Sequence, residues 1–223
     1  MVKKPLIVLN FKTYTEGMGD NAVRMAKYCE EVSDESGIEI IAVPQIPDIA
    51  LVAGSVKIPV YAQHIDGVGA GGYTGHITAD CVRSAGAQGC LVNHSERRLL
   101  LADVDSAIQS AKKAGLTVIT CTNNISVTSA AAALSPEYVA IEPPALIGSG
   151  IPVSKADPDI VTGSVEAVKK VNPNVKVLCG AGISSGDDVA AALELGTYGV
   201  LLASGVIKAK DQKAALIDLI GKV

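Results

Sequence analysis

A histidine and a glutamate stand at the ends of two apolar runs of the sequence. His94 follows the run 87–92, and Glu142 closes the run 137–142. Removal of a proton from carbon needs a carboxylate base and a neutral hydrogen-bond donor, held on rigid elements about one substrate apart. Backbone amides of a turn at 95–97 could hydrogen-bond the imidazole and hold it neutral. The pair therefore predicts a site that moves protons on a small substrate.

A lysine near the amino terminus indicates an anionic substrate. Lys12 closely follows Asn10 at the end of the apolar run 5–11. An ammonium group at the end of a buried strand is costly unless it faces a water-filled cleft or an anion. The alternative is a lysine that reaches the rim beside an acidic neighbour, with Asn10 as a plain strand-end hydrogen bonder.

Small residues follow the last two apolar runs, at 179–184 (CGAGIS) and 203–205 (ASG). Such turns leave backbone N–H groups accessible at helix starts, where they bind a phosphate without any side-chain charge. Tight turns from strand to helix also use small residues. These two runs are the last of eight apolar runs in the chain. In barrels of eight strands a phosphate site characteristically follows the last two strands, so the position of these turns favours a phosphate site.

The segment 145–154 after Glu142 has the composition of a lid. Two prolines fix its start, glycines at 148 and 150 permit backbone changes, and Leu146 and Ile147 can exclude water on closure. The alternative is an ordinary surface loop. His64 and His76 have no base or metal-ligand spacing nearby, so we interpret them as structural residues and predict no metal site.

Short apolar, β-branched runs alternate with amphipathic stretches along the whole chain. The runs predict strands at 5–11, 38–43, 58–63, 87–92, 116–121, 137–142, 175–179 and 198–203. The amphipathic stretches predict helices at 20–35, 103–114, 158–171 and 186–195, with caps at Asp103, Asp157 and Ser185.

Strict alternation of strand and helix predicts a parallel sheet with right-handed crossovers. Eight units without a linker favour closure into a (β/α)₈ barrel, a TIM barrel, formed by residues 1–223 as a single domain. A doubly wound sheet is the alternative, because the stretches 44–56 and 77–86 are short for crossover helices.

Composition narrows the class of protein. Apolar residues make up 48% of the chain, with one Phe and no Trp, which suits parallel strands buried on both faces. The net charge of -4, with both signs interspersed, argues against nucleic acid. Five cysteines without a C-x-x-C pair, and the lack of a long apolar run, predict a cytoplasmic protein that does not bind membranes.

The glycine-rich stretch 67–72 matches the spacing of a dinucleotide-binding fingerprint. That fingerprint needs a helix to open within its glycines and an acidic residue about 20 positions on. Here Tyr73 and His76 continue a loop. We therefore interpret this stretch as a projecting arm and predict no dinucleotide cofactor.

Four motifs taken together resemble the triosephosphate isomerase family, in its compact archaeal branch. They are Asn10-Phe11-Lys12, Asn93-His94-Ser95-Glu96, Glu142-Pro143 with the 147–150 loop, and Gly180-Ala181-Gly182. The resemblance covers nearly the whole chain. It implies interconversion of dihydroxyacetone phosphate and D-glyceraldehyde 3-phosphate, a step of glycolysis and gluconeogenesis, without metal or organic cofactor.

The resemblance also implies roles for individual residues. Glu142 would be the base that moves the proton between C1 and C2, and His94 the electrophile that polarises the carbonyl. Lys12 and Asn10 would interact with substrate and enediolate, and Glu96 would orient the hydrogen bonds of the site. Contacts to phosphate and lid, chiefly through backbone amides, are implied for Ile147, Gly182, Ala203 and Ser204.

The arm at 66–76 resembles the family's third loop, which inserts into a neighbouring subunit, so we predict a homo-oligomer, with a tetramer favoured over a dimer. Two other functions stay open. One is another phosphate-binding barrel enzyme, such as an aldolase that forms a Schiff base through Lys12. The other is a phosphosugar-binding protein without catalytic activity.

Overall fold

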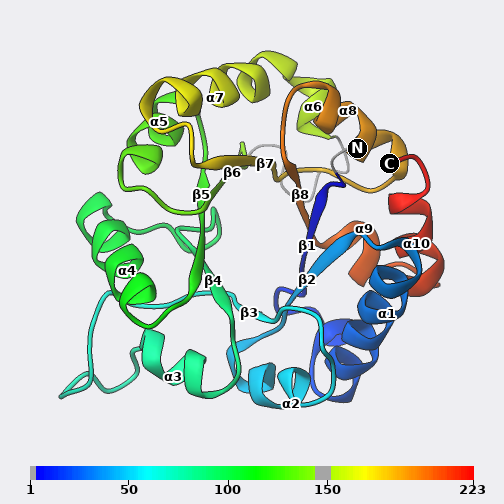
Figure 1. Cartoon of the computed structure of the whole chain (residues 1–223). Coiled ribbons are helices and arrows are strands. Elements are labelled where there is room, and N and C mark those ends of the chain that lie inside the picture. The colour runs from blue at the N-terminus through cyan, green and yellow to red at the C-terminus, as the bar shows by residue number, and fades with distance from the viewer. Residues whose placement is uncertain (1–3, 144–151) are drawn as a thin grey trace.

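A computed structural model describes residues 4–143 and 152–223, and within them the eight predicted strands are all present (Figure 1). They are β1 (Leu6–Asn10), β2 (Glu39–Val43), β3 (Tyr61–Ala62), β4 (Gly89–Val92), β5 (Thr117–Thr122), β6 (Tyr138–Ile141), β7 (Lys176–Cys179) and β8 (Gly199–Leu202). Each pairs in parallel with its neighbours, so the carboxyl ends of all the strands point to one end of the sheet.

The sheet closes on itself. Its strand order is β2-β1-β8-β7-β6-β5-β4-β3, and a parallel bridge from Ala42 to Val60 joins its two ends. Figure 1 shows the helices in a ring outside the strands, whereas a doubly wound sheet carries helices on both of its faces. The predicted (β/α)₈ barrel is therefore confirmed, and the doubly wound alternative is wrong.

The helices outside the barrel vary widely in length. The longer ones are α1 (Asp20–Ser36), α4 (Leu101–Lys113), α5 (Ile125–Ala133), α7 (Pro158–Val171), α8 (Gly186–Glu194) and α10 (Gln212–Ile220). The short ones are η1 (Thr15–Gly17), η2 (Ile46–Asp48), α2 (Ile49–Ala53), α3 (Ala79–Ser84), α6 (Val153–Ala156) and α9 (Ser204–Ile207). The stretches 44–56 and 77–86 thus contain only short helices, but these suffice to connect parallel strands.

Burial on both faces explains why the strands read as continuous apolar runs. Along β1, Leu6 and Val8 belong to a cluster inside the barrel, and Ile7 and Leu9 belong to the larger cluster between strands and helices. Side chains of a strand alternate between faces, so both faces must be apolar when both are covered. Val, Ile, Leu and Ala fill this core, as the composition predicts.

Two of the three predicted helix caps are correct. Asp157 accepts a hydrogen bond from the amide of Ile160, and Ser185 caps α8. The prediction for Asp103 is wrong, because α4 already begins at Leu101 and Leu100 is its cap residue. Asp103 lies in the first turn instead, where its negative charge is favourable beside the positive end of the helix dipole.

The glycine-rich stretch forms an arm and not a nucleotide-binding turn. No helix opens within it, since the next helix, α3, begins only at Ala79. Residues 69–76 are exposed, and Figure 1 shows this segment extending beyond the ring of helices. Its base is closed by the Asp66 amide, which donates to the Ile77 carbonyl at 2.8 Å.

Candidate active site

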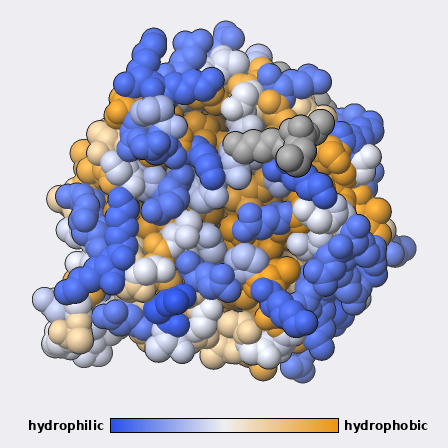
Figure 2. Space-filling model, viewed as in Figure 1, coloured by the Kyte–Doolittle hydropathy of each residue, from blue (hydrophilic) through white to orange (hydrophobic). Residues whose placement is uncertain are grey.

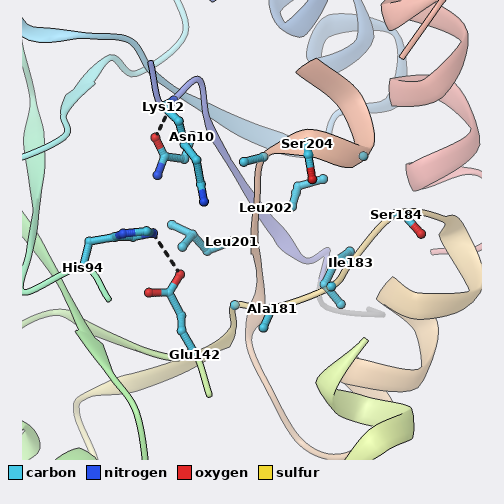
Figure 3. Close-up of a pocket in the computed structure, with 14 residues that line it drawn as sticks. Asn10, Lys12, His94, Glu142, Ala181, Ile183, Ser184, Leu201, Leu202 and Ser204 are labelled. Carbon is cyan, nitrogen blue, oxygen red and sulfur yellow. Dashed lines mark hydrogen bonds and ion pairs between the residues drawn. The ribbon is translucent and has the colours of Figure 1, made fainter. Parts of the chain in front are cut away.

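A cavity of about 260 Å³ opens at the carboxyl ends of the strands. Its walls come from β1, β4, β6, β7 and β8 and from the turns that follow them. The lining residues are Asn10, Lys12, His94, Glu142, Gly180, Ala181, Gly182, Ile183, Ser184, Leu201, Leu202, Ala203, Ser204 and Gly205. Segments that are far apart in the sequence therefore meet at one site, as Figure 3 shows. Figure 2 views the molecule from the amino-terminal ends of the strands, so it shows the face opposite this cavity, where hydrophilic residues cover much of the surface.

His94 and Glu142 face each other across this cavity (Figure 3). His94 Nε2 lies 3.4 Å from Glu142 Oε1, and the two residues are only 8% and 2% exposed. A carboxylate and an imidazole this close can share or exchange a proton, and burial strengthens their interaction. The predicted pair is thus brought together in space.

The surroundings of His94 push its protonation in opposite directions. Burial lowers the pKa of the imidazole, but the Glu142 carboxylate raises it, and the net direction is upward from 6.5. The amide of Glu96 donates to His94 Nδ1 at 3.2 Å, as predicted for this turn, and that bond requires Nδ1 to carry no proton. The amide therefore favours a ring with its proton on Nε2, the nitrogen that faces Glu142.

Glu142 is held in a fully buried position by its neighbours. Its amide donates to the Thr122 carbonyl at 2.7 Å, and its carbonyl accepts from Ser95 Oγ at 3.3 Å. A Cβ atom added at Gly180 would lie 2.7 Å from Glu142 Cγ, so the side chain needs a glycine there. Within the described residues Glu142 Oε2 is buried without a hydrogen-bond partner, and burial together with the neighbouring Glu142 carboxylate raises the pKa of the Cys121 thiol.

Lys12 brings positive charge to the opposite wall of the cavity. Its Nζ forms an ion pair with Glu96 Oε1 at 2.7 Å, and its side chain is 12% exposed. Its backbone has a φ of 50°, a left-handed conformation that costs about 1–2 kcal/mol for a residue other than glycine. Asn10 Oδ1 accepts from its amide at 2.9 Å, and Gln63 Nε2 donates to its carbonyl at 2.9 Å. These two bonds fix the strained turn.

The small-residue turns form one wall of the cavity, and they are more constrained than the sequence indicates. Gly182 has a φ of 71°, and a Cβ at Gly205 would lie 2.9 Å from Ser184 Cα. The amides of Ser184 and Ser185 both donate to Asp188, so they are already used as the cap of α8. An anion would therefore bind mainly at Gly182 and at the start of α9.

Most of the residues predicted from the sequence line the cavity. This holds for Asn10, Lys12, His94, Glu142, Gly182, Ala203 and Ser204. Glu96 lies at the rim and reaches the cavity through its contacts with Lys12 and His94. Ile147 lies outside the described residues, as does most of the predicted lid.

Sequence reasoning gave no role to Gln63, Leu201 or Asp188. Gln63 stands at the end of β3, and a strand-end position was the signal that could have assigned it to the site. Leu201 lies on β8 with its side chain toward His94 and Glu142 (Figure 3). Asp188 stands three residues after the predicted cap Ser185, and this capping-box spacing was the signal that could have assigned it to the start of α8.

Two other features bear on the predictions. His64 Nε2 lies 3.0 Å from Asp66 Oδ1, and His76 Nδ1 lies 3.4 Å from Asp66 Oδ2, at the base of the arm and apart from the cavity.

Among residues 4–143 and 152–223 there is no group of three His, Cys, Asp or Glu side chains that could hold a metal ion. The helices of the same residues include none long and apolar enough to cross a membrane.

Comparison with known proteins decides the family. The family model "Triosephosphate isomerase" matches residues 5–222. The chain belongs to the triosephosphate isomerase family. It is 63% identical to the triosephosphate isomerase of Methanosarcina mazei over 216 residues, 97% of each chain. It is 60% identical to that of Methanothermus fervidus over 217 residues, 97% of this chain and 98% of the other.

The fold agrees with that of a solved member of the family. The crystal structure of triosephosphate isomerase from Bartonella henselae superposes with a TM-score of 0.78, covering 98% of this chain and 100% of that chain at 20% identity. The relatives named above are archaeal, so the resemblance to the archaeal branch is confirmed. The prediction of a triosephosphate isomerase is confirmed with it.

Proposed function

We propose that the cavity carries out the triosephosphate isomerase reaction with Glu142 as its base. Glu142 removes a proton from C1 of dihydroxyacetone phosphate, an enediolate forms, and Glu142 returns the proton to C2 to give D-glyceraldehyde 3-phosphate. The proposal is supported by the 3.4 Å approach of Glu142 Oε1 to His94 Nε2 in a cavity that both residues line. A base that is buried in a small cavity keeps its proton from exchanging widely with water.

His94 is proposed as the electrophile. The Nε2 proton would be donated to the carbonyl oxygen, and the ring would then move protons between the two enediolate oxygens. Its Nε2 faces the cavity because the Glu96 amide occupies Nδ1. A triose between the two groups has to displace their direct 3.4 Å contact. The Glu142 carboxylate raises the pKa of the imidazole, and that displacement moves it away from the ring. The neutral imidazole is then favoured.

The remaining charges are proposed to stabilise the enediolate and hold the phosphate. Lys12 supplies positive charge near the developing oxyanion, and Asn10 hydrogen-bonds near the same atoms. Glu96 orients Lys12 through their ion pair. Amides at Gly182, Ala203 and Ser204 bind the phosphate, with Ile147 as a further contact in the lid. Closure of the lid prevents elimination of phosphate from the enediolate in water.

One observation carries this assignment: a carboxylate and an imidazole, both buried, meet at 3.4 Å inside a cavity that also contains a lysine and two glycine-rich turns. The Schiff-base alternative needs a neutral lysine as nucleophile. Lys12 Nζ is instead engaged by Glu96 Oε1 at 2.7 Å. The arrangement therefore favours the isomerase over an aldolase.

A coupled assay of the purified chain tests the residue roles. We expect turnover in both directions, and a fall in kcat of about a hundredfold or more for His94→Gln, the range typical of a lost general acid. His64→Gln is the matched control, because His64 is also buried but lies outside the cavity. Equal losses in the two variants, or a borohydride-trapped adduct at Lys12, would contradict the assignment.

A homo-oligomer in the cytoplasm, with a tetramer favoured over a dimer and a role in glycolysis and gluconeogenesis, is proposed as well. The support is apolar surface that a partner subunit would cover. It consists of the exposed arm at 69–76, where Tyr73 is 48% exposed, and of the exposed side chains of Leu100 and Leu101. Light scattering of the purified chain and of Tyr73→Ser gives the mass of each. A monomeric wild-type chain at micromolar concentration would contradict this proposal.

A further inference from the structure

The direction of the His94 side chain does not follow from the strand that precedes it. Along β4, Leu91 belongs to the cluster inside the barrel, and Cys90 and Val92 belong to the cluster between strands and helices. Continued alternation would send residue 93 inward and residue 94 outward, toward the helices. His94 lines the cavity instead. The residue between Val92 and His94 must therefore reset the direction.

Asn93 provides this change of direction through its backbone. Its φ is 62°, in the left-handed region, whereas strands have φ values near -120°. Asparagine is among the few residues other than glycine that adopt this conformation readily. The left-handed turn rotates the chain as it leaves β4, so that the next side chain enters the mouth of the barrel.

The Asn93 side chain then holds the turn at both of its ends. Its Nδ2 donates to the Cys121 carbonyl on β5 at 2.9 Å, and its Oδ1 accepts from the amide of Leu99 at 2.8 Å. The first bond ties the turn to the neighbouring strand. The second closes the segment 93–99 into a ring, with the side chain of Asn93 as the closing link.

This ring contains the groups that orient His94. Within it the Glu96 amide donates to His94 Nδ1, and the Arg97 amide donates to the His94 carbonyl at 2.7 Å. The Ser95 hydroxyl reaches across to the Glu142 carbonyl. A shift of the ring would therefore move His94 relative to Glu142. The phosphate-side wall, built on β7 and β8, would stay in place.

We infer that Asn93 is a positioning residue for catalysis: its left-handed backbone turns His94 into the cavity, and its side-chain amide fixes the ring that carries His94 and Glu96. The inference rests on the role of His94 proposed above. It assigns Asn93 no contact with substrate. Its effect is on kcat, through the alignment of the imidazole with the reacting oxygens.

Three substitutions separate the two contributions. Asn93→Gly keeps the left-handed backbone and removes both side-chain bonds. Asn93→Asp keeps the acceptor for Leu99 and replaces the donor to Cys121 with an oxygen that repels the carbonyl. Asn93→Ala removes both bonds and also disfavours the backbone conformation. Asn124→Ala is the matched control, since Asn124 lies on the same rim and bonds the Val127 amide, but its turn carries no cavity residue.

The test measures kcat, KM and inhibition by inorganic phosphate for each variant, together with the melting temperature. Misplacement of a catalytic group by about 1 Å can cost on the order of a hundredfold, so partial loosening predicts a loss of about tenfold in kcat for Asn93→Gly. A larger loss is expected for Asn93→Ala. The phosphate inhibition constant should change less than about twofold, because a shift of this size leaves the β7 and β8 wall intact.

Two results would overturn the inference. One is a kcat of wild-type size in Asn93→Gly. The other is a fall of both kcat and phosphate affinity in the Asn93 variants, with the same fall in Asn124→Ala. Such a result would indicate a general loss of structure. His94→Gln, measured beside them, separates this inference from the proposed function. If His94→Gln remains active, the role of His94 itself is wrong; if only the Asn93 variants remain active, Asn93 alone has been misassigned.

Discussion

Shortening the proposed base by one methylene group should slow the chemistry and leave binding nearly intact. In Glu142→Asp the carboxylate retracts by about 1 Å, and a misplacement of that size costs on the order of a hundredfold. A hundredfold corresponds to about 2.7 kcal/mol of activation free energy. The cavity wall cannot compensate for this retraction, because Gly180 has no side chain that could push the carboxylate forward. Residue 142 is also only 2% exposed in the wild type, so it is closely surrounded.

The assay is coupled turnover of both triose phosphates by wild type and Glu142→Asp. We expect kcat to fall about a hundredfold, with KM changed by less than about threefold, because the groups proposed to bind phosphate lie in the turns after β7 and β8. Glu137→Asp is the matched control: Glu137 precedes β6 and its carboxylate accepts from the Val118 amide, far from the cavity along the same strand. An unchanged kcat in Glu142→Asp, or a loss as large in Glu137→Asp, would refute the reasoning.

Three further predictions follow from the same contacts. Gly180→Ala should lower kcat by about tenfold or more in the coupled assay, because its Cβ would meet Glu142 Cγ at 2.7 Å and displace the base by part of an ångström; wild-type turnover would count against this. Glu96→Gln should lower kcat by loosening Lys12, whose Nζ it now binds at 2.7 Å, and unchanged turnover would remove Glu96 from the mechanism. In nitrogen NMR titrations the pKa of His94 should lie above 6.5 in the wild type, where burial lowers it but the Glu142 and Glu96 carboxylates together raise it further, and should fall in Glu142→Gln, where burial remains. The charged ring therefore contributes stability to the folded protein that is complete below pH 6.5 and is lost as the pH rises through the raised pKa. The same His94 pKa in the wild type and in Glu142→Gln would contradict this prediction.

The barrel was predictable from the sequence because its physics is local and repeated. Each strand is covered on both faces, so each reads as a short β-branched run, and all eight appear within a few residues of the predicted bounds. The helix at 158–171 was predicted to the residue, since Asp157 and Pro158 mark its start. The prediction of Asp103 as a helix cap was wrong because an acidic residue is favourable both at the cap and in the first helical turn.

The site was predictable only in part. Strand-end polar residues indicated His94, Glu142 and Lys12, because parallel strands place their carboxyl ends together. The inward direction of His94 was not predictable, since it depends on a left-handed φ at Asn93. Nor was the Lys12–Glu96 ion pair, whose partners are 84 residues apart and meet only through the closed barrel.

The central claim is that Glu142 itself carries the substrate proton beside His94. Isomerisation of dihydroxyacetone phosphate in deuterated water, followed by proton NMR, tests it most directly in wild type and Glu142→Gln. We predict that the wild type gives product in which part of the hydrogen at C2 is protium carried over from C1 and the rest is deuterium, and that Glu142→Gln gives neither product nor label above background. Labelled product at a comparable rate from Glu142→Gln would show that another group is the base, and would contradict the account.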